Sequence, residues 1–231
     1  MTDELHLQPR LQLLADLVPQ GARLADIGTD HGYLPVYLLQ KGRICSAIAA
    51  DIGQAPLQHA RNTALQYGIA EGLSFRCCDG LRGIGPEDAD VVVIAGMGGE
   101  TIMHILSQAP WTKAGSTLLL LQPMTKQEDL RRWLNENGYA QSAERLVRDK
   151  DYLYPVFTVF GGEQPPLTIA EIYGGVDIEV DPLAGEYLDQ RIRRLSQAEA
   201  GLRKSSDQVN AQRAGQLAEI RQSLTERRAE L

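Results

Sequence analysis

Long apolar runs are missing from this chain of 231 residues, and its amino terminus lacks the charged-then-apolar layout of a signal peptide. A membrane helix needs about 20 consecutive apolar residues. Cysteine is scarce: Cys45, Cys77 and Cys78 are odd in number and show no Cys/His spacing that indicates zinc. These absences predict a soluble protein of a reducing cytoplasm that binds no metal and whose cysteines are small buried hydrophobes.

Positive charge is also in deficit, since the formal net charge is −7. The charge is unevenly distributed, because residues 183–231 carry nine Arg/Lys and seven Asp/Glu, whereas residues 1–182 carry the whole acidic excess. Phosphate contacts depend on local patches more than on net charge. The acidic balance therefore disfavours an RNA partner without excluding it.

Apolar periodicity predicts alternating strands and helices up to about residue 160, which is typical of a doubly wound α/β sheet. Helices are expected over residues 7–18, 33–41, 54–67 and 126–137. Strands are expected before residue 28 and over residues 44–50, 73–78, 91–94 and 117–121, with the last two over 139–148 and 153–160.

Beyond residue 160 the composition changes. Residues 161–182 contain Gly-Gly and Pro-Pro pairs that indicate a linker. Residues 183–204 and 207–230 predict two long helices with apolar residues near heptad spacing, and the break at 205–207 lets them fold back as an antiparallel hairpin. We therefore divide the chain into a sheet domain (1–160), a linker (161–182) and a helical hairpin (183–231), and leave the oligomeric state open with a monomer favoured.

The most informative segment is residues 24–35, where an apolar run ends in a turn that contains glycine and opens a helix. Gly28 and Gly32 bracket this turn, and Pro35 is tolerated only in the first turn of the following helix. Ligands of open α/β sheets bind at such carboxyl ends of strands. A single turn of this kind is nevertheless as typical of packing as of ligand binding.

An aspartate stands at the end of each of the first three predicted strands: Asp26, Asp51 and Asp79. Asp51 lies at roughly the 20-residue offset at which nucleoside-binding α/β folds place a carboxylate on a ribose hydroxyl. Carboxylates are unfavourable beside a pyrophosphate, whereas S-adenosylmethionine (SAM) has a sulfonium, an ammonium and a ribose diol but no phosphate. The series favours SAM over a dinucleotide, although each aspartate taken alone is also suited to cap a helix.

Four motifs carry a resemblance to a known family. They are Asp-Ile-Gly-Thr-Asp-His-Gly-Tyr-Leu-Pro at 26–35, Asp-Ile at 51–52, Ile-Ala-Gly-Met-Gly-Gly at 94–99 and Leu-Gln-Pro-Met at 121–124. From residue 11 to about residue 160 the chain resembles class I SAM-dependent methyltransferases, in particular the bacterial tRNA (adenine-N1)-methyltransferases that act on position 22. Methyltransferases in general usually have glycine where Asp30 stands, and many that modify bases have an Asn/Asp-Pro-Pro-aromatic motif at 95–99.

The resemblance implies a Rossmann-like sheet as the SAM-binding domain, a helical C-terminal appendage that contacts tRNA, and methylation of N1 of adenine 22. Two alternatives stay open. One is SAM-dependent methylation of another RNA base or of a small molecule, and the other is a SAM-fold RNA-binding module without turnover. The helical hairpin likewise either contacts tRNA or only packs or dimerises.

The adenine ring nitrogen brings its own lone pair, so we expect no strong base but a carboxylate that stabilises the cationic product. Asp30 is the candidate for this role, with His31 beside it to contact the adenine or to shape the pocket. Cofactor contacts are expected from Asp26, Gly28, Gly32, Asp51, Ile52, Cys78, Asp79, Gly80, Ala95 and Gly96. Substrate contacts are expected from Met97, Gly98, Gly99, Gln122, Pro123 and Met124, and from Arg191, Arg194 and Arg203 of the C-terminal helices. Residues 96–99 are equally consistent with a tight turn that leads into a helix.

Overall fold

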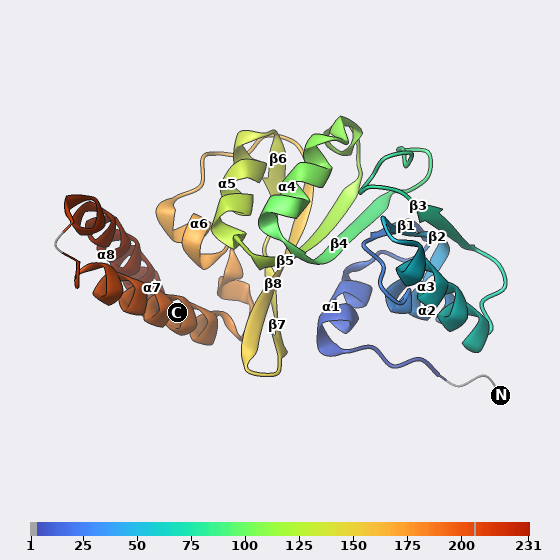
Figure 1. Ribbon diagram of the computed structural model, residues 1–231, viewed down its shortest axis with the longest axis horizontal. Helices are drawn as coiled ribbons and strands as arrows, with labels where there is room; N and C mark the ends of the chain where they lie inside the picture. The colour runs from blue at the N-terminus through green and yellow to red at the C-terminus, as the bar shows by residue number, and fades with distance from the viewer. Residues whose placement is uncertain (1–3, 206) are drawn as a thin grey trace.

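The computed structural model describes residues 4–205 and 207–231, and a mixed sheet runs through the centre of this part of the chain (Figure 1). Its strands are β1 (Ala22–Ile27), β2 (Ile44–Asp51), β3 (Leu73–Cys77), β4 (Val91–Gly98), β5 (Leu118–Thr125), β6 (Tyr139–Gln141), β7 (Arg145–Asp149) and β8 (Tyr152–Gly161). The strand order is β3-β2-β1-β4-β5-β8-β6, with β7 also paired to β8. Strands β1 to β5 are parallel and β6 to β8 are antiparallel additions. The predicted Rossmann-like α/β fold is confirmed.

Helices cover both faces of the sheet because alternate strand residues are apolar on both sides. The helices are α1 (Pro9–Leu17), α2 (Tyr33–Gln40), α3 (Gln54–Gln66), α4 (Gly99–Ser107), α5 (Gln127–Glu136), α6 (Ile169–Gly174), α7 (Ala184–Leu202) and α8 (Gln208–Ala229), with single turns η1 (Pro110–Lys113) and η2 (Ile178–Val180). In β1, Leu24 packs with α1 and α2, whereas Ala25 belongs to the core under α4 and α5. None of the helices within the described residues combines the length and apolarity that a bilayer span requires.

Three local predictions are wrong. The strand expected over 139–148 is divided into β6 and β7. Gln141 pairs with Val159 and Arg145 pairs with Val156, so the segment between β6 and β7 has one residue more than the part of β8 opposite it and bulges out of the ladder. The carboxyl ends of β4 and β5 run further than expected, through residues 95–98 and 122–125. Cys45 and Cys77 are exposed, because one lies near the start of β2 and the other at the end of the edge strand β3.

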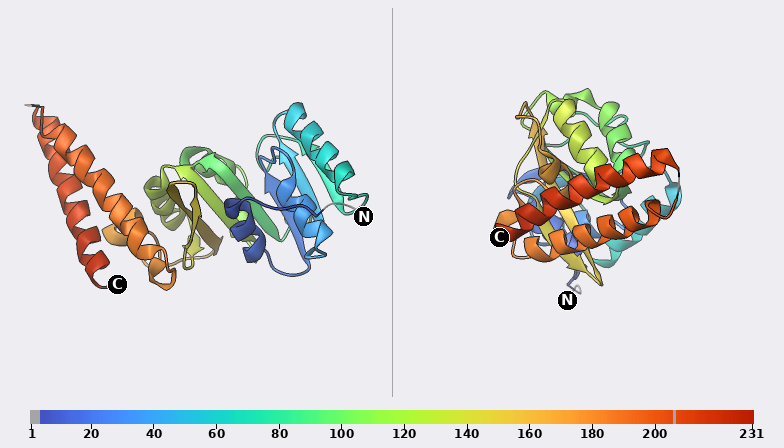
Figure 2. Two further views of the ribbon diagram at one scale, coloured as in Figure 1. Left: turned by 90° about the horizontal axis from the view of Figure 1, so that it is seen from below. Right: turned by 90° about the vertical axis from the view of Figure 1, so that its left-hand side faces the viewer.

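The two C-terminal helices pack side by side and antiparallel, and they extend away from the sheet (Figure 2). Their contact is apolar, with Leu188 and Leu195 of α7 against Ile220 and Leu224 of α8. The Asp207 side chain caps α8 by accepting a hydrogen bond from the Val209 amide at 3.1 Å. Ser206, part of the expected break, lies outside the described residues.

A fully buried ion pair connects the sheet to the segment expected as a linker, which contains α6 and η2. Arg131 of α5 donates from Nε and Nη2 to the two carboxylate oxygens of Glu144 at 2.7 and 2.8 Å, and both side chains have no exposed surface. Arg131 also donates to the Ile172 carbonyl at 2.9 Å, and Glu144 accepts from the Val176 amide at 3.0 Å. The Tyr187 hydroxyl of α7 lies 3.3 Å from Arg131. The pair therefore joins α5, the bulge before β7, α6 and α7.

We expect Glu144→Gln to lower the free energy of unfolding by about 3 to 5 kcal/mol, because it leaves the Arg131 charge buried without its counter-ion. The double variant Arg131→Met/Glu144→Gln should recover part of that loss, since it removes the unpaired charge. Urea unfolding of the wild type, both single variants and the double variant measures the coupling. Additive losses would mean that the two charges do not act as a pair.

Candidate functional site

A cavity of about 440 Å³ opens at the carboxyl ends of β1, β4 and β5. Nine residues predicted from the sequence line it: Asp26, Gly28, Asp30, His31, Gly32, Ala95, Gly96, Gln122 and Met124. Two further residues line the cavity and were not predicted: Gln8, just before α1, and Arg10, on α1. No local signal in the sequence distinguishes them, because the cavity side of α1 is defined only once the helix is packed on the sheet.

The turn after β1 is fixed by hydrogen bonds to the neighbouring strand. The amides of Gly28 and Thr29 both donate to the Ala50 carbonyl of β2, at 2.8 and 3.0 Å. Gly28 has φ of +77°, and a Cβ there would collide with the Met97 side chain, which lies over the turn. Gly28 is therefore required by its backbone angle, whereas the flexible end of the Met97 side chain can move aside.

The glycines predicted at the site divide into two groups. A Cβ on Gly32 would lie 2.9 Å from Ala60 of α3, and one on Gly80 would lie 2.9 Å from Ile105 of α4. A Cβ on Gly99 would lie 2.5 Å from the Lys126 carbonyl oxygen. Packing between elements accounts for these three glycines.

Gly96 is different: its φ of +75° requires glycine, but among the described residues no atom other than those of its chain neighbours lies within 4 Å of the Cβ position. Its amide donates to Gln122 Oε1 at 3.2 Å. The open space beside Gly96 faces the cavity, so this is the glycine whose backbone a ligand can approach.

Two carboxylates at the strand ends lack a cationic partner. Asp26 is 8% exposed, and burial raises the pKa of its carboxyl to about 6 although a hydrogen bond from the Thr29 side chain lowers it; the nearby Asp51 carboxylate adds to the rise. Asp51 accepts a hydrogen bond from the Gly53 amide at 2.7 Å. Neither forms an ion pair with any residue that the structure describes. This end of the site is suited to a ligand that brings a positive charge and hydroxyl donors.

The other predicted cofactor residues continue from Asp51 along the edge of the sheet rather than lining the cavity. The Cys78 amide donates to the Asp51 carbonyl at 3.0 Å, and burial raises the pKa of the Cys78 thiol. Asp79 lies 3.6 Å from Arg82 in an exposed ion pair. Ile52 is 73% exposed, which leaves its apolar side chain available to cover a ligand.

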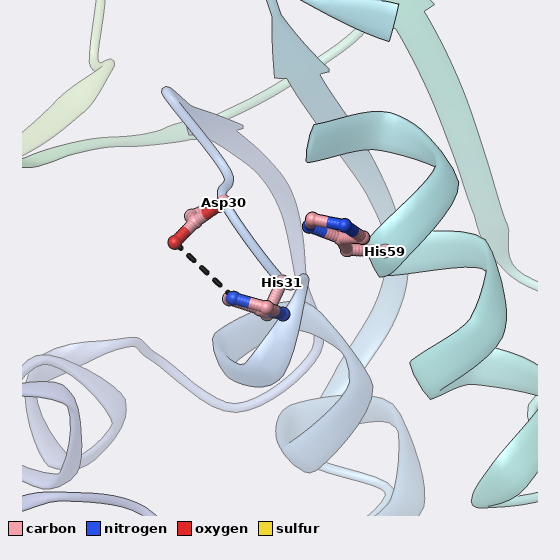
Figure 3. A group of neighbouring side chains, drawn as sticks. All are labelled: Asp30, His31 and His59. Carbon is pink, nitrogen blue, oxygen red and sulfur yellow. Dashed lines mark ion pairs between the residues drawn. The ribbon is translucent and has the colours of Figure 1, made fainter. Parts of the chain in front are cut away.

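Asp30 and His31 lie together at the mouth of the cavity (Figure 3). His31 Nε2 is 3.3 Å from Asp30 Oδ2, and the Asp30 side chain is 73% exposed. The His31 ring stacks between Tyr33 and His59, with centroid distances of 5.2 and 4.9 Å. His59 comes from α3 and was not predicted, because nothing in a helix sequence shows which face meets a distant turn.

Asp30, His31 and His59 also hold three potential metal-ligand atoms within 4.8 Å of one another. The two imidazole planes are nearly parallel, with an interplanar angle of 10°. An ion in the plane of one ring lies outside the plane of the other, so these side chains do not converge on a metal as they are placed.

Gln122 forms the floor of the cavity between α1 and β4. It is 1% exposed, and its Oε1 accepts from Arg10 Nη1 at 3.3 Å as well as from Gly96. Its Nε2 lies 3.4 Å from Met124 Sδ. Pro123 pairs with Met97 in the β4–β5 ladder, so both are next to the cavity, and Gly98 lies at the amino end of α4.

The three predicted arginines lie on α7 and its end, away from the cavity (Figure 2). Arg191 is largely buried and bonds Glu128 and the Tyr173 carbonyl, both at 3.0 Å. Arg203 pairs with Glu199 at 2.9 Å. Arg194 is exposed and lies over the Tyr152 ring, 5.8 Å from its centroid. The structure therefore does not bring these three side chains into one site.

Comparison with known proteins adds independent information. A family model of a methyltransferase domain matches residues 7–157. The tRNA (adenine(22)-N(1))-methyltransferase of Bacillus subtilis is 34% identical over 186 residues, which cover 80% of this chain and 76% of that protein. The crystal structure of the B. subtilis enzyme has a TM-score of 0.86 at 30% identity and covers 96% of this chain and 99% of that chain. A putative tRNA (m1A22) methyltransferase of Streptococcus pneumoniae, solved in complex with S-adenosyl-L-methionine, has a TM-score of 0.83 at 30% identity with the same coverage.

We expect Asp26→Asn to stabilise the ligand-free protein at pH 7.5 by up to about 3 kcal/mol, because the raised folded-state pKa means that ionised Asp26 opposes folding. The gain should shrink as the pH falls through 6 towards 4, where the folded-state carboxyl is already protonated. Urea unfolding at pH 7.5, 5.5 and 4 measures the difference. Asp30→Asn, which changes an exposed carboxylate, serves as the control, and an equal gain in that variant would contradict the role of burial.

Proposed function

This chain belongs to the tRNA (adenine(22)-N(1))-methyltransferase family of SAM-dependent enzymes, and from that premise we propose that it transfers a methyl group from SAM to N1 of adenine 22 in tRNA. The observation that carries the proposal is the cavity in which Asp26, Thr29 and Gly96 meet at the carboxyl ends of the parallel strands. A tRNA substrate also implies the cytoplasm as the place of action.

The residues present fit SAM. The open space at Gly96, in a cavity that Asp26 also lines, leaves room for a ligand to lie against the protein backbone. Asp26 would hold the ammonium group and Asp51 the ribose diol, with Ile52, Cys78 and Asp79 beyond Asp51 at the adenine end. Asp26 and Asp51 also disfavour a pyrophosphate at the same place.

SAM supplies a methyl group on a positively charged sulfur, which leaves as a neutral thioether. The adenine nitrogen already has a lone pair, so the main task of the protein is to align the base with the methyl group. Asp30, exposed at the cavity mouth, places a carboxylate beside the ring that becomes cationic. His31 lies against Asp30 and limits where its carboxylate points.

An adenine within folded RNA has to leave its stack to reach this cavity. Gly96 lets the base approach the backbone, and the Met97 side chain beside it offers a flexible apolar surface. Gln122 is held by hydrogen bonds on its carbonyl oxygen, so its orientation is fixed. We propose that Gln122 and the adjoining Pro123 and Met124 form the far wall of the base pocket.

The function is tested by incubating the protein with SAM and an unmodified tRNA transcript that has adenine at position 22, then digesting the RNA to nucleosides for mass spectrometry. We expect 1-methyladenosine, and its loss when position 22 is changed to guanosine. Methylation of a different base would favour the alternative of another RNA target. SAM binding with no methylated product from any tRNA would favour a non-catalytic binding module.

We expect Asp51→Ala to weaken SAM binding by roughly ten- to a hundredfold, because it removes a charge-assisted hydrogen bond to the ribose. Isothermal titration calorimetry measures the affinity. Asp51→Asn is the matched control, since its amide oxygen can still accept from the Gly53 amide but it has no charge. If Asp51→Ala weakens SAM binding and Asp51→Asn does not, the hydrogen bond to the Gly53 amide rather than the negative charge is responsible. Unchanged affinity in both variants would refute the assignment of Asp51 to the ribose.

We expect Asp30→Asn to lower kcat by about a hundredfold or more while the SAM dissociation constant stays within a few fold, because Asp30 is assigned to the transition state and not to the cofactor. Single-turnover methylation and calorimetry on the same protein separate the two quantities. An equal loss of SAM binding and turnover would instead make Asp30 a cofactor ligand.

A further inference from the structure

Two arginines and two tyrosines form a continuous series of contacts that begins at the cavity. The Arg10 guanidinium lies 5.3 Å from the centroid of the Tyr154 ring, the Tyr154 and Tyr152 rings lie 6.3 Å apart, and Arg194 lies 5.8 Å from the Tyr152 ring. Arg10 lines the cavity itself. We name this series, Arg10–Tyr154–Tyr152–Arg194, the arginine–tyrosine path.

The path crosses three elements that are distant in the sequence. Arg10 is on α1, the two tyrosines are on β8 and Arg194 is on α7. Figure 1 shows the β7–β8 hairpin between α1 and α7, and the left-hand view of Figure 2 agrees. The path therefore leads from the cavity to the middle of α7.

The two ends of the path differ in how they are held. Arg10 is fixed by Asp149, 2.6 Å from its Nε, and by Gln122, so its contact with Tyr154 holds α1 against the β7–β8 hairpin. At the outer end, Tyr152 is 52% exposed. Arg194 forms no ion pair with any of the residues described, whereas Arg191, Arg203, Arg221, Arg227 and Arg228 are each paired with a carboxylate. Packing between elements accounts for Arg10 at the inner end. It does not account for the exposed Tyr152 ring and the Arg194 guanidinium at the outer end.

We propose that the outer part of the arginine–tyrosine path is a stacking surface for tRNA nucleotides near the target adenine. The proposal rests on the proposed function and assigns the surface by which that substrate is held. When the target base leaves its stack, the neighbouring bases lose a partner, and their exposed faces can stack on aromatic rings or on guanidinium planes. Tyr152 supplies such a ring and Arg194 adds a positive charge for the backbone.

Continuity with the cavity and the charge of Arg194, which has no carboxylate partner among the described residues, both favour RNA as the occupant. Because Arg10 lines the cavity, the nucleotides next to a base inside it would come close to the path. The exposed tyrosine and the unpaired arginine then offer stacking without sequence preference and attraction for phosphate. This assignment also distinguishes among the three predicted arginines, because it retains Arg194, whereas Arg191 and Arg203 are occupied by Glu128 and Glu199.

The test uses the full-length protein, because residues beyond 162 complete the surroundings of the buried Arg131–Glu144 pair. The variants are Tyr152→Ala, Tyr152→Phe and Arg194→Gln, with Arg193→Gln as the matched control for loss of one exposed charge on the same helix. The dissociation constant for an unmodified tRNA transcript with adenine at position 22 is measured by fluorescence anisotropy at several salt concentrations. Calorimetry with SAM confirms that each variant retains the cofactor site.

Tyr152→Ala should weaken tRNA binding by roughly fivefold or more, as expected for the loss of one stacked base, without changing the salt dependence. Tyr152→Phe should stay within about twofold of wild type. Arg194→Gln should weaken binding and reduce the slope of log affinity against log salt by about one. Arg193→Gln should have the smaller effect of the two arginine changes.

Wild-type affinity in Tyr152→Ala, or equal losses in Arg193→Gln and Arg194→Gln, would overturn the path as a stacking surface. These results are separable from failure of the proposed function. If the wild type binds tRNA but forms no methylated product, the function fails while the binding comparison still decides the path. If the wild type methylates tRNA and Tyr152→Ala binds as tightly, only the path fails.

Discussion

The parallel pairing of β1 with both β2 and β4 is the constraint on which the site depends. It brings the carboxyl ends of three strands to one edge, so that Asp26, Asp51 and Gly96 become neighbours although they are far apart in the chain. The two amide hydrogen bonds to the Ala50 carbonyl then fix the turn after β1 relative to β2. The candidate contacts with the cofactor are made from this framework and the segments that directly follow it, apart from Cys78, Asp79 and Gly80, which follow β3.

The two aspartates at the turn illustrate how one short motif supplies different chemistry. Asp26 ends a buried strand, so its ionised form is disfavoured until a cation compensates for the lost solvation. Asp30, four residues later, has left the sheet and is mostly in solvent. The protein therefore has one carboxylate whose charge depends on the ligand and another that is exposed to an incoming base.

The sequence predicted the sheet, the turn and most of the cavity lining because these follow from local patterns: apolar strands, glycine turns and aspartates at strand ends. The prediction from sequence was wrong or incomplete where contacts between distant residues determine the structure. Residues 139–148 have the composition of a single strand, but Glu144 turns inwards to meet Arg131 of the preceding helix, and the strand is interrupted. Gln8, Arg10 and His59 reach the site only through helix packing, which local periodicity does not determine.

The glycines also show what the sequence does not determine. Gly96 and Gly99 stand three positions apart in one motif and yet have different surroundings. The motif itself therefore does not reveal which of them faces a ligand. Similarly, Arg191 and Arg194 are three residues apart on α7, and only the tertiary structure shows that one is already occupied by a carboxylate. Residue type and spacing identified the region of the site, and contacts assigned the individual roles.

The buried Arg131–Glu144 pair has a consequence for the order in which the chain matures on the ribosome. Arg131 and Glu144 leave the exit tunnel together, but the Ile172 carbonyl, the Val176 amide and the Tyr187 hydroxyl that complete their surroundings are synthesised later. Until then, two charges remain at the edge of a nascent sheet whose strands have all been made. The catalytic half therefore reaches its final packing only after the beginning of α7 has emerged, so completion of the active domain depends on the first part of the helical extension.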